Sequence, residues 1–235
     1  MIVAKSLNAG YGKLQVLYEV DLEARPGEIT AVVGPNGSGK STLLKAITGI
    51  AKIFGGHVYI GDRDATKMPA HERARLGLAY LQQTKNVFQN LTVLENLRMA
   101  AYTLDADKFR GKLEEVLEIV PIKPYLNRPA RELSGGWRQM VAVAMALMRD
   151  AKYFLFDEPT AQLSPKFATD ILTLIQKLRD MGRTIILAEQ NAKKALETSD
   201  KAYLLVSGRV NYTGPASELL NNKELGRLYL GLVKP

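Results

Sequence analysis

The sequence predicts an α/β fold in which a mixed, mostly parallel sheet surrounds a phosphate-binding loop. Three observations predict this class. A glycine-rich loop, residues 34–42, lies between an apolar β-branched segment at 29–33 and a helical segment at 43–47. Two further apolar segments, 153–156 and 184–188, are typical of buried strands and run directly into polar side chains. The 235 residues are 46% hydrophobic and 24% charged, which is ordinary for a soluble globular protein and ample for a core.

Composition excludes several kinds of chemistry. The chain contains no cysteine, so it has no disulfide, no cysteine-ligated zinc and no thiol nucleophile. We expect no signal peptide, and the longest apolar run, residues 140–147, is far shorter than the roughly 18 residues of a spanning helix. The formal charge is +8, but basic residues are scattered and no nucleic-acid motif is visible. We therefore expect a solvated basic surface and no nucleic-acid partner.

The first 28 residues predict an antiparallel β-subdomain. Residues 2–4 and 16–22 are expected to form short strands, with a turn at 9–12 between them. Tyr11 lies in that turn, where an aromatic ring could stack on a nucleotide base. A single tyrosine more often serves packing, so the residues alone leave both roles open.

The loop at 34–42 has the composition of a phosphate-binding P-loop. Its glycines allow a sharp turn and close approach of the backbone to an anion, and the following helix adds the positive end of its dipole. Lys40 can reach the β- and γ-phosphates, and Ser41 can ligate Mg²⁺. A glycine-rich surface turn is the alternative, and the flanking strand and helix argue against it. The residues expected to bind ATP here are Gly34, Pro35, Asn36, Gly37, Ser38, Gly39, Lys40, Ser41 and Thr42.

After this helix, glycines at 49 and 55–56 are expected to break the chain. A strand at 57–60 and a short helix at 69–75 follow, and a strand at 78–81 leads to Gln83. Ligands of open α/β sheets bind at the carboxyl ends of strands, so Gln83 is a candidate ligand-binding residue. Without further context, a polar residue that simply leaves the sheet is the favoured interpretation.

The pattern becomes purely helical from residue 91 to residue 129, with helices expected at 95–102 and 108–120. We assign residues 84–150 to an inserted helical subdomain, and residues 1–83 with 151–235 to the α/β core of a single domain. A long helix within the insertion begins after Ser134, a natural N-cap. Gly135 and Gly136 leave backbone N–H groups open at its positive end, which makes a second anion-binding shape.

Two carboxylates follow the apolar segment 153–156. Burying carboxylates without partners is costly, so this arrangement is more often catalytic than structural. Asp157 can hold Mg²⁺ through water, and Glu158 can polarise an attacking water molecule. Beyond them we expect a helix, a strand, a short helix, a hairpin and a helical tail, at residues 167–181, 184–188, 192–198, 201–213 and from 215 onward.

The glycine loop at 34–42, the segment 133–139 and the segment 154–158 occur in one chain in that order. Across essentially its whole length the chain therefore resembles the ATP-binding subunit of an ABC transporter. The resemblance implies that Tyr11 stacks on adenine with Val16 packed nearby. It also implies that Gln83 meets Mg²⁺ and leads into the surface that contacts a membrane subunit.

The same resemblance assigns Ser134, Gly135 and Gly136 to the γ-phosphate of an ATP bound by a second subunit. It assigns a catalytic switch position to Gln190, where most of the family has a histidine. The glutamine amide cannot gain a proton, yet it can still donate a hydrogen bond. Two further departures from the family pattern are Trp137, where glutamine or glutamate is usual, and Ser164, where many relatives have aspartate.

The resemblance implies an ATPase that uses ATP and Mg²⁺ to power transport. Its implied partners are transmembrane permease subunits, a second ATP-binding subunit of identical or related sequence and, indirectly, an extracytoplasmic solute-binding protein. The implied location is peripheral, on the cytoplasmic face of the cell membrane. Segments 87–97, 188–191 and 229–231 are similar to the branched-chain amino acid importer subgroup. The alternatives are lipid or lipopolysaccharide export, a soluble ABC ATPase of DNA repair or translation, and a module that binds nucleotide without hydrolysing it.

Overall fold

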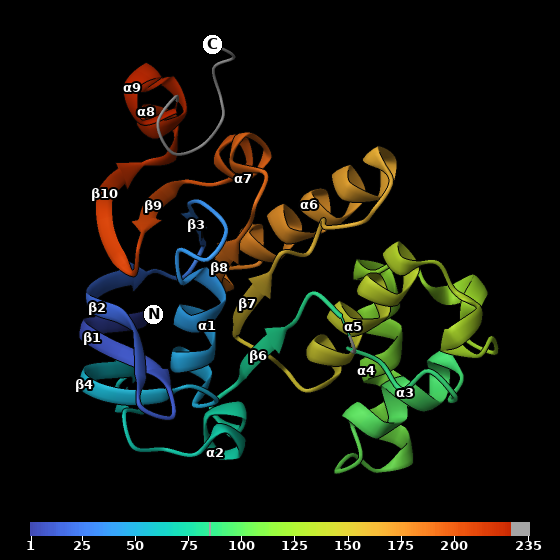
Figure 1. Ribbon diagram of the computed structural model, residues 1–235. Helices are drawn as coiled ribbons and strands as arrows, with labels where there is room; N and C mark the ends of the chain where they lie inside the picture. The colour runs from blue at the N-terminus through green and yellow to red at the C-terminus, as the bar shows by residue number, and fades with distance from the viewer. Residues whose placement is uncertain (85, 227–235) are drawn as a thin grey trace. The chain divides into compact units, whose positions relative to one another are not determined.

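A computed structural model describes residues 1–84 and 86–226 (Figure 1). The chain divides into two compact units, which are described separately here. Unit 1 contains Met1–Tyr80, Lys152–Glu158 and the described residues from Leu178 onward, and unit 2 contains Leu81–Ala151 and Pro159–Lys177. The division suggested by the sequence, with a helical subdomain at 84–150, stays a prediction. The predicted subgroup segment at 229–231 lies outside the described residues.

Unit 1 is built on the mixed sheet that the sequence predicts. The strand order is β10-β9-β3-β8-β7-β6, and β8 and β9 pair in parallel with β3, as β7 does with β8. The strands are β3 (Glu28–Val33), β6 (Leu78–Leu81), β7 (Tyr153–Asp157), β8 (Thr184–Ala188), β9 (Lys201–Val206) and β10 (Arg209–Pro215). All five residues of β8 are buried, as expected for a parallel strand covered on both faces.

The register of this sheet brings three strand ends together. Ala188 pairs with Val32 on one side and with Asp157 on the other. Because parallel strands point the same way, the residues that follow β3, β7 and β8 leave the sheet at one edge. These residues are the glycine loop, Glu158 and Glu189.

A second sheet of unit 1 is antiparallel, with order β2-β1-β4-β5. Its strands are longer than the sequence predicts and run over Ile2–Tyr11, Leu14–Ala24, Lys52–Ile60 and Arg63–Asp64 for β1, β2, β4 and β5. The predicted turn at 9–12 was wrong, because β1 continues to Tyr11 and the turn is at Gly12 and Lys13.

The predicted break at 55–56 was also wrong, because both glycines lie inside β4. A β-bulge explains the error. The register between β1 and β4 shifts between Lys5 and Asn8, and Gly56 has a φ of +80° there. A side chain at Gly56 would overlap backbone carbonyl oxygens of β1. The glycine is therefore required by close strand pairing and does not end the strand.

The helices of unit 1 cover these sheets. They are α1 (Lys40–Thr48), α2 (Ala70–Arg75), α7 (Ala192–Thr198), α8 (Ala216–Asn221) and α9 (Lys223–Leu225). Helix α1 buries Leu43, Leu44 and Ile47 in a core shared with β1, β2 and β4. This burial anchors the helix that carries the glycine loop at its N-terminus.

Unit 2 is helical. It contains α3 (Val93–Ala100), α4 (Ala106–Ile119) and α5 (Gly135–Met148), two 3-10 turns at Lys123–Tyr125 and Ala130–Glu132, and most of α6 (Pro165–Asp180). Helix α3 begins with a capping box, in which Thr92 and Glu95 each accept a hydrogen bond from the other's backbone N–H. Helix α5 buries most of its apolar residues.

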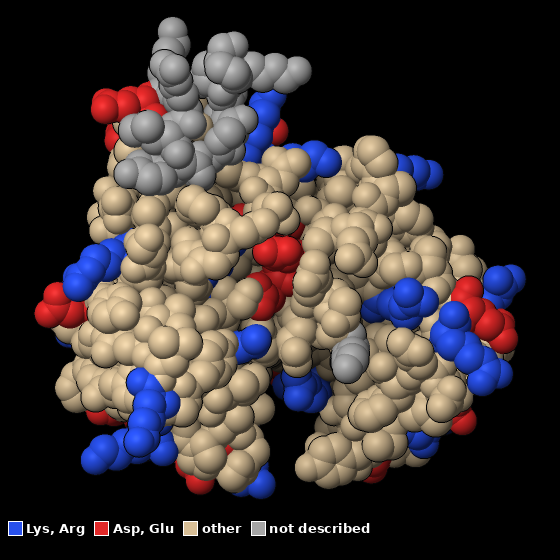
Figure 2. Space-filling model, in the orientation of Figure 1, with Lys and Arg blue, Asp and Glu red and all other residues tan. Residues whose placement is uncertain are grey.

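The surface charge and the helix lengths can be compared with the expectations from the sequence. On the face shown in Figure 2, lysine and arginine side chains are spread over the surface, as the sequence predicts. Within residues 1–84 and 86–226, no helix combines the length and the apolar character needed to cross a bilayer.

Candidate active site

The glycine loop forms an anion cradle at the N-terminus of α1. Gly34 has a φ of +152°, and a side chain there would overlap the carbonyl oxygen of Leu205, so only glycine fits. The N-cap of α1 is Gly39, which has no side chain to cover the first N–H groups of the helix. Among the described residues, Ser38 Oγ is one of the few buried side-chain atoms without a hydrogen-bond partner. Open N–H groups beside an unpaired hydroxyl suit phosphate oxygens.

Lys40 supplies the positive charge of this cradle. It is 5% exposed, and its ammonium donates hydrogen bonds to the carbonyl oxygens of Gly34 (2.9 Å) and Pro35 (3.0 Å). Burial lowers the pKa of the Lys40 ammonium, and the nearby carboxylates of Glu158, Asp157 and Glu189 oppose that change. The cation therefore lies close to all three carboxylates, which leave the sheet at the same edge.

Asp157 is held by two hydroxyl groups. Ser41 Oγ donates to Asp157 Oδ1 at 2.8 Å, and the Tyr80 hydroxyl donates to Asp157 Oδ2 at 2.7 Å. Burial, followed by the hydrogen bond to Asp157, raises the pKa of Tyr80 far above its usual value, so the phenol remains a neutral donor. Ser41 and Asp157 were both predicted metal residues. Tyr80 was missed, because a tyrosine in an apolar strand carries no local signal of such a role.

The pairing of Ser41 with Asp157 fits a magnesium ion. Mg²⁺ in nucleotide sites is usually held by one or two protein groups, waters and the phosphates themselves. Within the described residues, no group of three or more His, Cys, Asp or Glu side chains could hold a metal by protein ligands alone. A hydroxyl next to one carboxylate is therefore the kind of donor set that such an ion uses together with a nucleotide.

Glu158 lies directly after β7 in a strained conformation. Its φ is +50°, which is uncommon for a residue with a side chain, and its N–H donates to the carbonyl of Ala188 at 2.8 Å. This backbone bond holds Glu158 against the end of β8. The predicted switch residue, Gln190, follows the same strand end and is exposed, and its N–H donates to Glu189 Oε2 at 3.2 Å.

Tyr11 and Val16 lie beside the glycine loop. The Tyr11 hydroxyl is 3.4 Å from Thr42 Oγ1, and the Lys45 ammonium lies 5.9 Å from the centre of the Tyr11 ring. Tyr11 is 42% exposed, which leaves room for a flat ligand to approach it. The side chain of Val16 lies next to Gly39: a Cβ atom added to Gly39 would be 3.5 Å from Val16 Cγ1. This position suits a base attached to phosphates in the loop.

In unit 2, the second glycine motif opens α5. Ser134 is the N-cap and its side chain makes no capping hydrogen bond, while Ser134 and Gly135 are exposed. Gly136 packs so closely on the Phe167 ring that a side chain could not fit. Trp137 points into the same packing, with its ring centre 4.5 Å from Tyr125 and 5.5 Å from Phe167. The unusual tryptophan thus belongs to an aromatic cluster that supports the motif.

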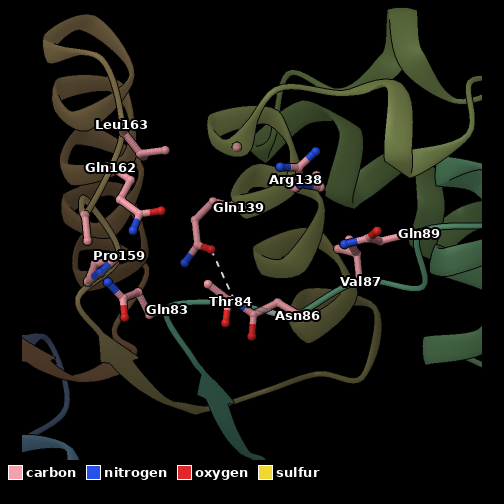
Figure 3. Close-up of a pocket in the computed structure, with 12 residues that line it drawn as sticks. Gln83, Thr84, Asn86, Val87, Gln89, Arg138, Gln139, Pro159, Gln162 and Leu163 are labelled. Carbon is pink, nitrogen blue, oxygen red and sulfur yellow. Dashed lines mark hydrogen bonds between the residues drawn. The ribbon is translucent and has the colours of Figure 1, made fainter.

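Gln83 lines a cavity of about 550 Å³ within unit 2 (Figure 3). Side-chain amides from three segments surround it, and the centre of the view is occupied by Gln139 of α5. The Gln139 carbonyl accepts a hydrogen bond from Asn86 Nδ2 at 3.2 Å, whereas its buried Nε2 has no partner in the described structure. The residues that line the cavity include Gln83, Thr84, Asn86, Val87, Gln89, Gly135, Arg138, Gln139 and Gln162. The role of Gln83 at Mg²⁺ stays a prediction.

Comparison with known proteins decides the family. The model of the ABC transporter family matches residues 17–161, which include both glycine motifs and the two carboxylates. The chain belongs to the ABC transporter family. The sequence-based identification, the P-loop NTPase fold and the assignment as an ATPase of this family are thereby confirmed.

Individual relatives agree over the full length of this ABC chain. A probable branched-chain amino acid transport ATP-binding protein, LivF from Archaeoglobus fulgidus, is 52% identical and covers 99% of this chain and 100% of its own. The lipopolysaccharide export system ATP-binding protein LptB from Escherichia coli is 33% identical. The match covers 98% of this chain and 97% of LptB. Among solved structures, the ATP-binding cassette MJ0796 in a dimeric, post-hydrolysis state with ADP and Pi matches with a TM-score of 0.80 at 26% identity. The match covers 92% of this chain and 99% of the MJ0796 chain.

Proposed function

We propose that this ABC ATPase powers the import of a small solute, and that the solute is a branched-chain amino acid. The observation that carries the ATPase part is the meeting of Lys40 with Glu158 and Asp157 at one strand edge. The solute follows from the relative that is 52% identical, since the lipopolysaccharide export protein is only 33% identical.

In the proposed reaction, backbone N–H groups of the glycine loop and Lys40 bind the triphosphate, and Tyr11 stacks on adenine beside Val16. Ser41, and Asp157 through water, would hold Mg²⁺, which would supply charge neutralisation at the phosphates. Glu158 accepts the proton of the attacking water or orients that water. Its strained backbone, bonded to Ala188, supports this role by fixing the side chain relative to Lys40.

A second ATP-binding subunit completes the proposed site. Ser134, Gly135 and Gly136 expose the N-terminus of a 14-residue helix whose first N–H groups are not covered by the N-cap side chain. Such a terminus attracts anions. We assign it to the γ-phosphate of ATP held by the opposing subunit, with Gln190 donating from the nucleotide's own subunit.

The cavity around Gln139 supports docking of a permease segment. A buried amide N–H without a partner costs free energy unless an acceptor reaches it. The backbone carbonyls at the end of a short helix would supply that acceptor, and the segment from Gln83 to Leu97 would surround the helix. We accordingly place the protein peripherally, on the cytoplasmic face of the membrane, with a solute-binding protein acting indirectly through the permease.

Reconstitution tests the solute. The ATPase and its permease subunits are inserted in liposomes, and ATP turnover is measured with leucine and its binding protein, or with lipopolysaccharide. Stimulation by leucine supports import, whereas stimulation by lipopolysaccharide alone would transfer the chain to the export class. Turnover that is independent of any permease would favour the soluble class of ABC ATPases.

The docking site can be tested by cross-linking, because the chain has no cysteine of its own. A Val87→Cys variant places a single thiol in the cavity lining. Lys108→Cys, on the exposed side of α4, is the matched control. A thiol cross-linker should join the first variant to the permease and leave the second unlinked; equal yields would reject this docking site.

A further inference from the structure

The pair of hydroxyl groups on Asp157 raises the question of what keeps this carboxylate oriented once a metal is bound. Asp157 is 6% exposed, and its two oxygens accept from different residues, Oδ1 from Ser41 and Oδ2 from Tyr80. An ionised carboxylate accepts hydrogen bonds and donates none. The direction of its oxygens is therefore set by these two donors.

The two donors, Ser41 and Tyr80, differ in whether they are also assigned to the metal ion. Ser41 is assigned to Mg²⁺, so its hydroxyl oxygen would also have to serve as a ligand when the ion is bound. Tyr80 is not assigned as a metal ligand. Its ring is half-buried on β6, the strand next to β7 in the sheet, and its hydroxyl lies 2.7 Å from Asp157 Oδ2.

We propose that Tyr80 is a positioning residue for magnesium, which fixes the Asp157 carboxylate so that Oδ1 faces the ion and Ser41. Donors behind a metal-binding carboxylate orient it and raise metal affinity. A rigid aromatic side chain on a sheet strand suits this purpose, because few rotatable bonds separate the hydroxyl from the backbone. This inference rests on the proposed magnesium site of Ser41 and Asp157.

Tyr80→Phe removes the hydroxyl and keeps the ring. Binding of the non-hydrolysable analogue AMP-PNP is measured by calorimetry, once with EDTA and once with Mg²⁺. The readout is the ratio of the two dissociation constants, which reports metal binding and not turnover. We expect Mg²⁺ to enhance binding about tenfold less in Tyr80→Phe than in the parent. Affinity in EDTA should stay within about twofold, since Tyr80 does not contact the nucleotide in this assignment.

Tyr153→Phe is the matched control. Tyr153 is another half-buried tyrosine of the same sheet, and its hydroxyl lies against Gly61 and away from Asp157. In the Tyr153→Phe variant, Mg²⁺ should strengthen the binding of AMP-PNP by the same factor as in the parent. If Tyr80→Phe folds poorly, Tyr80→Met provides a second side chain without a hydroxyl, and it must show the same selective loss.

The outcomes separate the two proposals. An unchanged enhancement in Tyr80→Phe overturns the role of Tyr80 and leaves the magnesium site intact. An equal loss of affinity with and without Mg²⁺ also overturns it, because that pattern reports general damage to the site. If the parent itself shows no enhancement by Mg²⁺, the proposed magnesium site fails and this inference fails with it.

Discussion

At the scale of single residues, we propose that hydrolysis depends on the side chain of Glu158. We expect Glu158→Gln to bind ATP normally and to hydrolyse it about 10²–10⁴-fold more slowly, the usual cost of losing a general base. The amide keeps the size of the side chain but cannot accept the proton. Single-turnover hydrolysis and nucleotide binding are measured on the same preparation. Near-normal turnover would remove Glu158 from the mechanism.

Lys40 gives a prediction about pH. Burial lowers the pKa of this ammonium, so the folded protein releases the proton at a lower pH than an ordinary lysine would. The charged form binds phosphate. Affinity for nucleotide should therefore fall as the pH rises through the lowered pKa. Calorimetry across the alkaline range tests this, and Lys40→Ala should bind weakly at every pH. An affinity that stays flat for the parent would contradict the assignment of Lys40.

The same electrostatics affect stability with the opposite sign. The pKa of Lys40 is lower in the folded protein than in the unfolded chain. At pH values between these two pKa values, the unfolded chain therefore binds more protons at this group than the folded protein does. The unliganded fold therefore gains stability from this group as the pH rises through that window. Stability of the unliganded fold and affinity for nucleotide thus respond to loss of the same proton in opposite directions.

At the scale of elements, Arg73 holds the far end of the P-loop helix. It is 2% exposed, and its guanidinium donates to the carbonyls of Ala46 and Ile47 (both 2.7 Å), Met68 (2.9 Å) and Thr66 (3.1 Å). Burial lowers the pKa of Arg73, and Asp64 opposes that change. A cation at this end also complements the negative pole of α1.

Arg73→Met should therefore lower the free energy of unfolding by about 3 kcal/mol, because several carbonyls lose a charged donor. For a chain of this size such a loss lowers the melting temperature by roughly 6–12 °C. Arg75→Met, on the exposed side of the same short helix, is the control and should change little. Calorimetric melting of both variants checks this, and equal stability would show that the contacts of Arg73 carry no net free energy.

Elements differ in how far the sequence predicts them. Strands β7 and β8 were predicted almost to the residue, because buried parallel strands form continuous apolar runs that end in polar groups. Strand β4 was half missed, because its bulge places glycines where local rules indicate a break. Arg73 and Tyr80 were missed for another reason. Their roles depend on carbonyls and a carboxylate that lie far away in sequence, and nothing in their local pattern indicates those partners.

At the scale of the whole molecule, the proposal requires two ATP-binding subunits. Ser134→Arg places a bulky side chain at the exposed N-cap of α5, so it should prevent ATP-driven dimerisation and leave the monomer folded. Light scattering with ATP in a Glu158→Gln background measures the dimer. Ser217→Arg, on the exposed surface of α8, makes the same substitution elsewhere and should still dimerise. A dimer that survives Ser134→Arg would show that this helix end does not face a second nucleotide.

The aromatic cluster beside this helix end has a practical consequence. Trp137 is the chain's single tryptophan, and it directly follows the glycine motif between the rings of Tyr125 and Phe167. Tryptophan fluorescence of the unmodified protein, excited selectively over the tyrosines, therefore reports from one known place. Any movement of the motif that separates these rings will alter the emission, so the catalytic cycle can be followed in real time without attaching a dye.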